Sequence, residues 1–294
     1  MRADLRIFVA GAAVVAAVAT AAGAQSEADG RVLASRRVAP DAVFKIWIPD
    51  GEMRMIAWDR DSLLVRGRIA TGDKFFVGGD ARGMKFGVEH PFSEGSGGKS
   101  AIVVYLPRRA RVSVKTVTTK VDAANVSGSF YSVSGSMHLS GAASSIEAET
   151  MTGGLDLDVT TPWLRARTGD GHLLLRGAPE DVDVSTVAGT LDVATGAIRR
   201  GQFGSVSGDI HYAGAPASGA IMEFSNHSGN VELMLPRTVS GVFSLTAITG
   251  VIENGMSSVR PTASQPRSVR FSLGRGGSQV TVRTFKGSIR LRPQ

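Results

Sequence analysis

The 294-residue chain contains no cysteine. This absence excludes disulfide bridges, thiolate metal ligands, a cysteine nucleophile and a lipid-modified N-terminal cysteine. Aromatic residues make up only 6% of the sequence, and the 36 glycines suit many tight turns better than a thick globular core. P-loop, H-E-x-x-H and G-x-S-x-G motifs are also absent. Composition and motifs therefore indicate no specific catalytic activity.

Long hydrophobic runs are absent after the first two dozen residues. Arg2 and Arg6 precede an apolar run from Ile7 to Ala19, and Ala22-Gly23-Ala24 matches an A-x-A cleavage site. This is the pattern of a secretory signal peptide, and the run is too short for a transmembrane helix. We predict a signal peptide over residues 1–24, no transmembrane span, and export to the periplasm or the exterior.

Acidic residues are absent after Glu253, although the chain as a whole has a net charge of +7. The basic tail predicts either a solvated face or a face that contacts an anionic envelope surface, such as lipopolysaccharide or phospholipid headgroups. The interleaving of basic and aromatic residues that is typical of nucleic-acid-binding proteins is missing. We therefore expect no nucleic-acid partner.

A phrase built around one glycine recurs through the second half of the chain, mostly at steps of 18 to 21 residues. The residues five before and two after the glycine are always apolar, and the residue four after it is apolar in all copies but one. This alternation predicts two strands, each with one buried face, on either side of a corner. The corner positions are Thr119, Gly135, Gly153, Gly171, Gly189, Gly208, Gly229, Gly250 and Gly287.

The position three residues before the glycine carries a hydroxyl or amide side chain in eight of nine copies. Such side chains hydrogen-bond turn backbone, so we expect them to form a ladder along the stacked corners. The glycine itself is expected to supply a left-handed φ at each corner.

Self-similarity at this period is typical of a solenoid. We predict an all-β, single-domain parallel β-solenoid (β-helix) of about nine coils; an antiparallel sandwich remains the alternative, because half the period matches hairpin spacing. Residues 25–106 lack the phrase and would form an N-terminal β cap or opening coils, in which Trp47 packs. Residues 107–294 would form the repeat region, with an insertion at about 255–265. We expect Val269–Leu273 and Gln279–Arg283 to close the rod.

Several stretches together resemble a known family. They are Glu52–Asp59 followed by Leu64–Gly67, then Tyr105–Arg108, the serial glycine phrase, and Val280–Leu291. Their order resembles the bacterial "putative adhesin" families of unknown function, which are exported β-strand-repeat proteins with a parallel β-solenoid. The resemblance covers roughly residues 30–294 and implies an adhesin-like protein. It transfers no catalytic residue, because the family has none established.

One set of residues suggests a binding site. Three residues after each corner, the side chain should face solvent, and coils stacked at ~4.8 Å would bring neighbours within reach of a bridging cation. We predict no catalytic or cofactor-binding residues, and we treat this outward column as a hypothetical metal site or sugar-binding strip. The alternative is a solvated face whose charges discourage sheet aggregation. Its candidate ligands are Asp122, His138, Asp156, Asp192, His211, Glu232 and Glu253, with Leu174 and Arg290 interrupting the row.

The leading hypothesis for function is a non-enzymatic, exported, adhesin-like rod with a binding or structural role at the cell envelope. Its partner would be a cell-surface glycan, an anionic envelope surface or another envelope protein. The first alternative is a polysaccharide-active β-helix enzyme, which needs clustered carboxylates in a cleft. The second is an accessory protein of an envelope-stress system.

Overall fold

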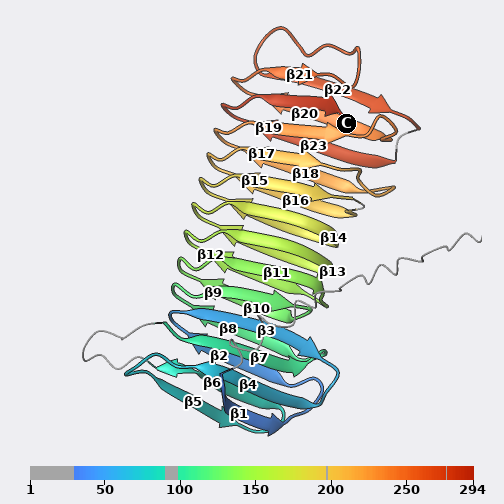
Figure 1. Cartoon of the computed structure of the whole chain (residues 1–294). Helices are drawn as coiled ribbons and strands as arrows, with labels where there is room; N and C mark the ends of the chain where they lie inside the picture. Colours follow the sequence, from blue (N-terminus) through green and yellow to red (C-terminus); the bar gives the residue numbers. More distant parts are fainter. Residues whose placement is uncertain (1–29, 90–98, 197, 276) are drawn as a thin grey trace, which may run out of the picture.

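The computed structural model describes residues 30–89, 99–196, 198–275 and 277–294. Within these ranges there are 24 strands and no helix, so the all-β prediction is confirmed. The strands stack into an elongated rod that runs from the N-terminal strands at one end to the C-terminal region at the other (Figure 1). No helix in these ranges is long and apolar enough to cross a bilayer. The predicted signal peptide at 1–24 lies outside the described residues.

The strands that precede the corners form one face, which we name the leading sheet. Neighbouring strands in this sheet are parallel, except at its two ends, where the pairs β5–β6 and β20–β22 are antiparallel. Its order in space is β5 (Lys74–Gly79), β6 (Gly83–Glu89), β2 (Val43–Ile48), β8 (Arg111–Thr116), β10 (Ser127–Ser132), β12 (Ile146–Thr150), the second halves of β13 (Leu155–Thr168) and β14 (Leu173–Thr186), β16 (Arg200–Ser205), β18 (Ile221–Asn226), β23 (Ser278–Thr284), β20 (Gly241–Ala247) and β22 (Arg267–Leu273).

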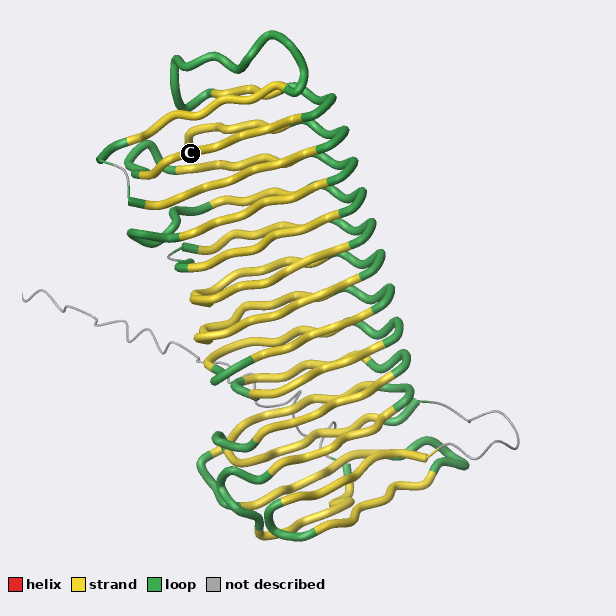
Figure 2. The backbone as a smooth tube through the Cα atoms, turned by 180° about the vertical axis from the view of Figure 1, so that it is seen from behind, coloured by secondary structure: helices red, strands yellow, loops and turns green. Residues whose placement is uncertain are grey.

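The strands that follow the corners form the opposite face, the trailing sheet. It is parallel except where β4 pairs with β1 and β7. Its order is β1 (Arg31–Arg37), β4 (Ser62–Arg68), β7 (Ala101–Pro107), β3 (Glu52–Trp58), β9 (Lys120–Ala124), β11 (Met137–Ala142), the first halves of β13 and β14, β15 (Leu191–Thr195), β17 (Ile210–Ala213), β19 (Val231–Leu235), β24 (Ile289–Pro293) and β21 (Ile252–Asn254). The tight corners between the sheets line one edge of the rod (Figure 2).

The core lies between the two sheets and is built from the positions that the alternation predicted. Every apolar residue five before, two after and four after the corner is buried. In one region the core is aromatic: the rings of Phe203 and Phe224 stack with centroids 4.7 Å apart, and Tyr212 packs edge-on at 5.4 Å from Phe224. Each fully buried large side chain contributes about 1.5–3 kcal/mol relative to exposure. The repeated phrase is therefore the sequence signature of this core.

The corner glycines are required for a reason other than the one we expected. None of the eight has a φ in the left-handed region. Instead, a Cβ on each would lie well inside 3.0 Å of the carbonyl oxygen of the corner residue in the adjacent coil, a separation that real Cβ atoms essentially never show. At Gly171, for example, the obstructing atom is the carbonyl oxygen of Gly153. The left-handed expectation is wrong, and close backbone stacking is what excludes a side chain.

At the ends of the rod, the order of the coils in space differs from their order in the sequence. The last coil, β23–β24, lies between the coil β18–β19 and the coil β20–β21, so only β22 of the two expected closing segments lies at the end. The N-terminal end has the same out-of-order stacking: the coil β2–β3 lies between the coil β6–β7 and the coil β8–β9. The prediction that 279–283 closes the rod is wrong. The C-terminal strand β24 is thus held between β19 and β21, and residues 255–266 carry no strand.

Candidate functional site

The residues of the predicted outward column do form one row on the trailing sheet. Neighbouring coils place Asp122, His138, Asp156, Leu174, Asp192, His211, Glu232, Arg290 and Glu253 in direct register, in that order. At the N-terminal end the row continues to Arg54. The structure therefore brings all seven candidate ligands onto one strip of surface.

Four of the five acidic side chains of this strip lie next to a histidine or an arginine. Asp156 lies 3.2 Å from His138 Nδ1 and accepts a 2.6 Å hydrogen bond from Arg176. Glu232 contacts His211 at 3.7 Å and Arg292 at 3.2 Å.

Two other acids of the strip have single partners. Asp192 lies 3.4 Å from His172 Nε2, and Glu253 lies 3.3 Å from Arg290. Among the described residues, no group of three or more His, Asp or Glu side chains converges on a point that could hold a metal ion. Half-exposed pairs of this kind contribute about 0–1 kcal/mol each.

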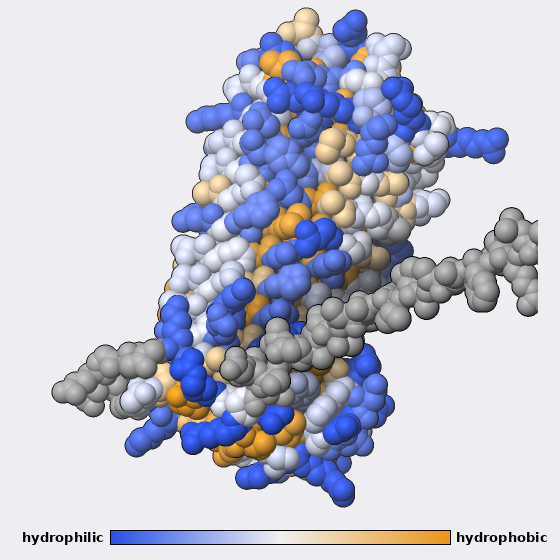
Figure 3. All heavy atoms as spheres, viewed as in Figure 1, coloured by the Kyte–Doolittle hydropathy of each residue, from blue (hydrophilic) through white to orange (hydrophobic). Residues whose placement is uncertain are grey.

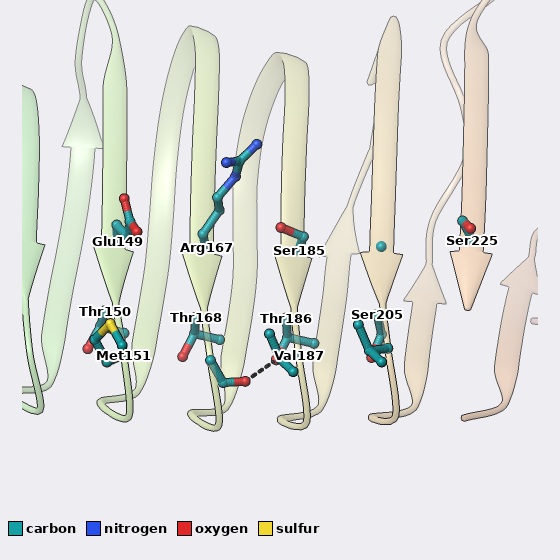
Figure 4. Close-up of a pocket in the computed structure, with 13 residues that line it drawn as sticks. Glu149, Thr150, Met151, Arg167, Thr168, Ser185, Thr186, Val187, Ser205 and Ser225 are labelled. Carbon is teal, nitrogen blue, oxygen red and sulfur yellow. Dashed lines mark hydrogen bonds between the residues drawn. The ribbon is translucent and has the colours of Figure 1, made fainter. Parts of the chain in front are cut away.

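A second candidate site is a hollow on the outer face of the leading sheet. Figure 4 shows a hollow that crosses successive strands, with side chains from each coil along it. The hollow measures 520 Å³, and a second hollow of 300 Å³ continues it toward the C-terminal end by sharing Ser205 and Ser225. Its outward row carries the small residues Ser185, Gly204 and Ser225 where neighbouring coils carry Arg167 and Arg283. We name this feature the axial groove.

The predicted hydroxyl ladder lies beneath the axial groove, with its side chains buried at the corners. The Oγ1 of Thr168 accepts the N–H of Gly171 at 3.1 Å and donates to the carbonyl of Gly153 at 3.2 Å. Asn226 makes the equivalent pair of bonds through its Oδ1 and Nδ2 atoms. Ser132 and Thr150 also accept the N–H of their own corner glycine, and they donate to the preceding coil at the carbonyls of Val117 and Val133. The prediction that these side chains bind turn backbone is confirmed, and each side chain ties its own corner to the preceding coil. Ser205 departs from the pattern, because its buried Oγ has no hydrogen-bond partner.

One wall of the groove is an exposed apolar ridge on the corner edge. Solvent reaches 53% of Met151, 52% of Val187 and 50% of Val206. Toward the C-terminal end, the ring of Phe285 is 44% exposed and stacks on His227 at 4.9 Å. Exposed large apolar residues that recur along one line are typical of an interaction surface. The groove thus combines small polar residues on its outward row with an apolar wall, and it is open along the rod.

The charges beside the groove are arranged as a ladder of alternating sign. Arg165 lies 3.7 Å from Glu147 and 3.4 Å from Asp183, and Arg167 lies 3.6 Å from Asp183. On the visible face in Figure 3, hydrophilic residues dominate, and apolar ones form a narrow band along the rod and a cluster near its N-terminal end.

Shifted pKa values occur at groups away from the groove. The Arg108 guanidinium hydrogen-bonded to Asp59 lowers the pKa of that carboxyl, and Arg200 does the same at Asp181. In the core, burial raises the pKa of Tyr212. Perturbed groups that gather in a cleft mark a catalytic centre. These lie apart on separate parts of the rod.

Comparison with known proteins identifies the class. The family model described as Toastrack DUF4097 matches residues 50–292, so the chain belongs to this family. The resemblance inferred from the sequence is thereby confirmed.

Two solved structures are similar to the chain. One, from Bacteroides fragilis NCTC 9343, is described as a putative adhesin; it has 10% identity and a TM-score of 0.45, with 90% of this chain and 98% of that chain covered. The other, from Clostridium sporogenes ATCC 15579, is described as a putative cell adhesion protein; it has 8% identity and a TM-score of 0.25, with 89% and 98% covered. No curated protein matches.

Sequence reasoning found the strip on the trailing sheet but missed its partners and the axial groove. His172, Arg176 and Arg292 lie at other offsets from the glycine, so a search confined to one column does not see them. The groove arises from small residues at the position four before the corner and apolar residues two before it. Reading those two columns together would have revealed it.

Proposed function

We propose that the protein is a non-enzymatic, exported, adhesin-like parallel β-solenoid that binds a glycan chain along its leading sheet at the cell envelope. In this proposal residues 1–24 are a signal peptide and residues 25–106 form the N-terminal cap or opening coils. Residues 107–294 form about nine coils, with an insertion at about 255–265. Membership of the Toastrack DUF4097 family supports the adhesin-like class without defining a ligand.

The observation that carries the proposal is the axial groove. It runs across successive coils, which repeat at the ~4.8 Å strand spacing, so it fits an extended polymer better than a compact small molecule. The hydroxyl groups of Ser185 and Ser225 on the outward row and the apolar ridge match the two sides of a sugar ring, one polar and one rich in C–H groups. A glycan chain has this combination along its whole length.

The enzymatic alternative needs a positioned acid and base. Carboxylates that cleave glycosidic bonds face each other across the substrate. In the described part of the chain, Glu149 is the one carboxylate that lines the groove. The envelope-stress alternative predicts a membrane-protein gene encoded next to this one, and gene neighbourhood would reveal it.

A glycan array with the mature chain tests the proposal. We expect specific retention of a glycan, with no new reducing ends or unsaturated products after prolonged incubation. Turnover of the retained glycan would favour the enzyme, and an array without any retained glycan would contradict the proposal.

A matched pair of variants tests the location. Ser185→Trp places a large ring in the middle of the groove, whereas Ala194→Trp places the same ring on the exposed face of the trailing sheet. We expect at least tenfold weaker binding in the first variant only, because the ring fills the space that the sugars need. Equal affinities in both variants would place the ligand elsewhere.

A further inference from the structure

The outer face of the leading sheet changes character at its N-terminal end. Here β6, β2 and β8 bring three lysines together: Lys45 lies directly beside Lys85 on one side and Ser113 on the other, and Lys115 lies beside Trp47. A hollow of 440 Å³ opens among them. We name these residues the lysine patch; its lining is Lys45, Ile46, Trp47, Lys85, Ser113 and Lys115.

The charges of the lysine patch are not neutralised in the way that charges are elsewhere on the rod. The outer rows of the later coils alternate in sign and form ion pairs, as at Arg165 and Asp156. In the ranges that the structure describes, no carboxylate lies within 4.0 Å of the ammonium groups of Lys45, Lys85 or Lys115. Like charges placed opposite each other on neighbouring strands are destabilising. Such a departure from the alternation is expected where the missing counter-charge comes from a ligand.

Aromatic rings border the same patch. Trp47, expected to pack inside the cap, instead points outward and is 37% exposed. Across the sheet, Trp47 is paired with Gly87 on β6, and Gly87 is paired with Phe76 on β5. The ammonium group of Lys85 lies 5.5 Å from the centroid of the Phe76 ring. At Gly87 a Cβ would lie well inside 3.0 Å of the Trp47 carbonyl oxygen, so this position between the rings stays free of side-chain atoms.

This combination specifies a ligand class. Aromatic faces pack against the C–H side of a sugar ring, while ammonium groups bind carboxylate or phosphate. The row that holds Trp47 and Lys115 continues through Tyr131 and Glu149 into the axial groove. One chain could therefore lie along both features.

We propose that the lysine patch binds the anionic group of an acidic glycan, a polysaccharide whose sugars carry carboxylate or phosphate. The inference rests on the proposed function in taking the ligand to be a glycan, and it adds the charge that the glycan carries. The three ammonium groups neutralise the anion, and the Trp47 ring supports the sugar that bears it.

Calorimetric titration of an oligogalacturonate and of its neutral methyl ester into the mature chain tests the inference. We expect the acid to bind at least about tenfold more tightly than the ester, with the difference shrinking as salt is added. Lys45→Gln combined with Lys85→Gln should remove this preference. The matched control, Lys74→Gln with Lys120→Gln, changes the same charge on exposed lysines outside the patch and should retain it.

A second readout separates binding from structure. Because the substitutions relieve repulsion, the patch variant should melt at the same temperature as the parent or higher. A lower melting temperature together with weaker binding would overturn the inference.

Three further results would also overturn the inference. Equal binding of acid and ester would refute the lysine patch and leave glycan binding in place. Binding of neither would also refute the lysine patch, and it would contradict the proposed function as well if the glycan array retained nothing. Lysine-dependent sedimentation with phosphatidylglycerol–phosphatidylcholine vesicles, without oligogalacturonate binding, would assign the patch to a membrane surface.

Discussion

The sharpest structural prediction concerns Gly171→Ala. A methyl group here would lie against the carbonyl oxygen of Gly153 and the Oγ1 of Thr168. The two coils would have to separate locally. That separation strains the hydrogen bonds from the Gly171 N–H to Thr168 and from Thr168 to the Gly153 carbonyl, at 3.1 and 3.2 Å.

The expected cost follows from these contacts. Each buried hydrogen bond contributes about 1 kcal/mol, and overpacking costs about 1–3 kcal/mol, which gives a total of about 3–5 kcal/mol. A glycine needed only for a left-handed φ would cost less, about 1–2 kcal/mol on replacement by alanine, and asparagine would be tolerated there. Close stacking predicts that Gly171→Asn is at least as harmful as Gly171→Ala.

Urea unfolding of the variants measures the cost. Gly154→Ala is the matched control, because its Cβ would meet only an ordinary contact at 3.6 Å, and we expect it to be neutral or stabilising by up to about 1 kcal/mol. The reasoning would be refuted if Gly171→Ala unfolded at the same urea concentration as Gly154→Ala, or if Gly171→Asn restored the parental midpoint.

Three further predictions follow from the core, the C-terminal end and the charged strip. Tyr212→Phe removes a buried hydroxyl without a partner and should stabilise by about 1 kcal/mol in urea unfolding. Because burial raises the pKa of Tyr212, the parent should also lose stability relative to this variant as the pH rises above about 10, and parallel pH profiles would contradict this. Deleting 278–294 removes a coil from inside the stack, so hydrogen exchange should show 241–273 unprotected; fraying limited to the truncated end would contradict this, and deleting 256–264 is the control. We expect no heat from Ca²⁺ or Zn²⁺, because no three His, Asp or Glu side chains of the described residues converge on one point; heat that Asp192→Ala abolishes would support the cation-site hypothesis.

The coil interior could be predicted from the sequence because stacking imposes the same demand on every copy. A residue such as Leu191 must be apolar in each coil, since its neighbours above and below occupy the same line. The order of the coils could not be predicted in this way. Since each coil offers the same strand edges, the phrase around Gly287 is the same whether its coil lies at the end or inside.

The binding surfaces escaped prediction for a related reason. Lys45, Lys85 and Lys115 are far apart in the chain and lie in or next to a region without the glycine phrase, so no alignment relates them. Only the pairing of β2 with β6 and β8 brings them together. The role of the corner glycines was misassigned because a left-handed turn and a close backbone approach both favour glycine. A recurring glycine in the sequence therefore does not distinguish between them.

The most direct measurement of the binding surface is a photoaffinity footprint with an oligosaccharide retained on the array, bearing a photoreactive group at each end in turn. If the leading sheet binds the chain, cross-links should fall on its outer rows, from the Lys45 region through Ser185 to Ser225, with the two ends marking different coils. Cross-links on the trailing sheet, around Asp192 and His211, would contradict a binding surface on the leading sheet.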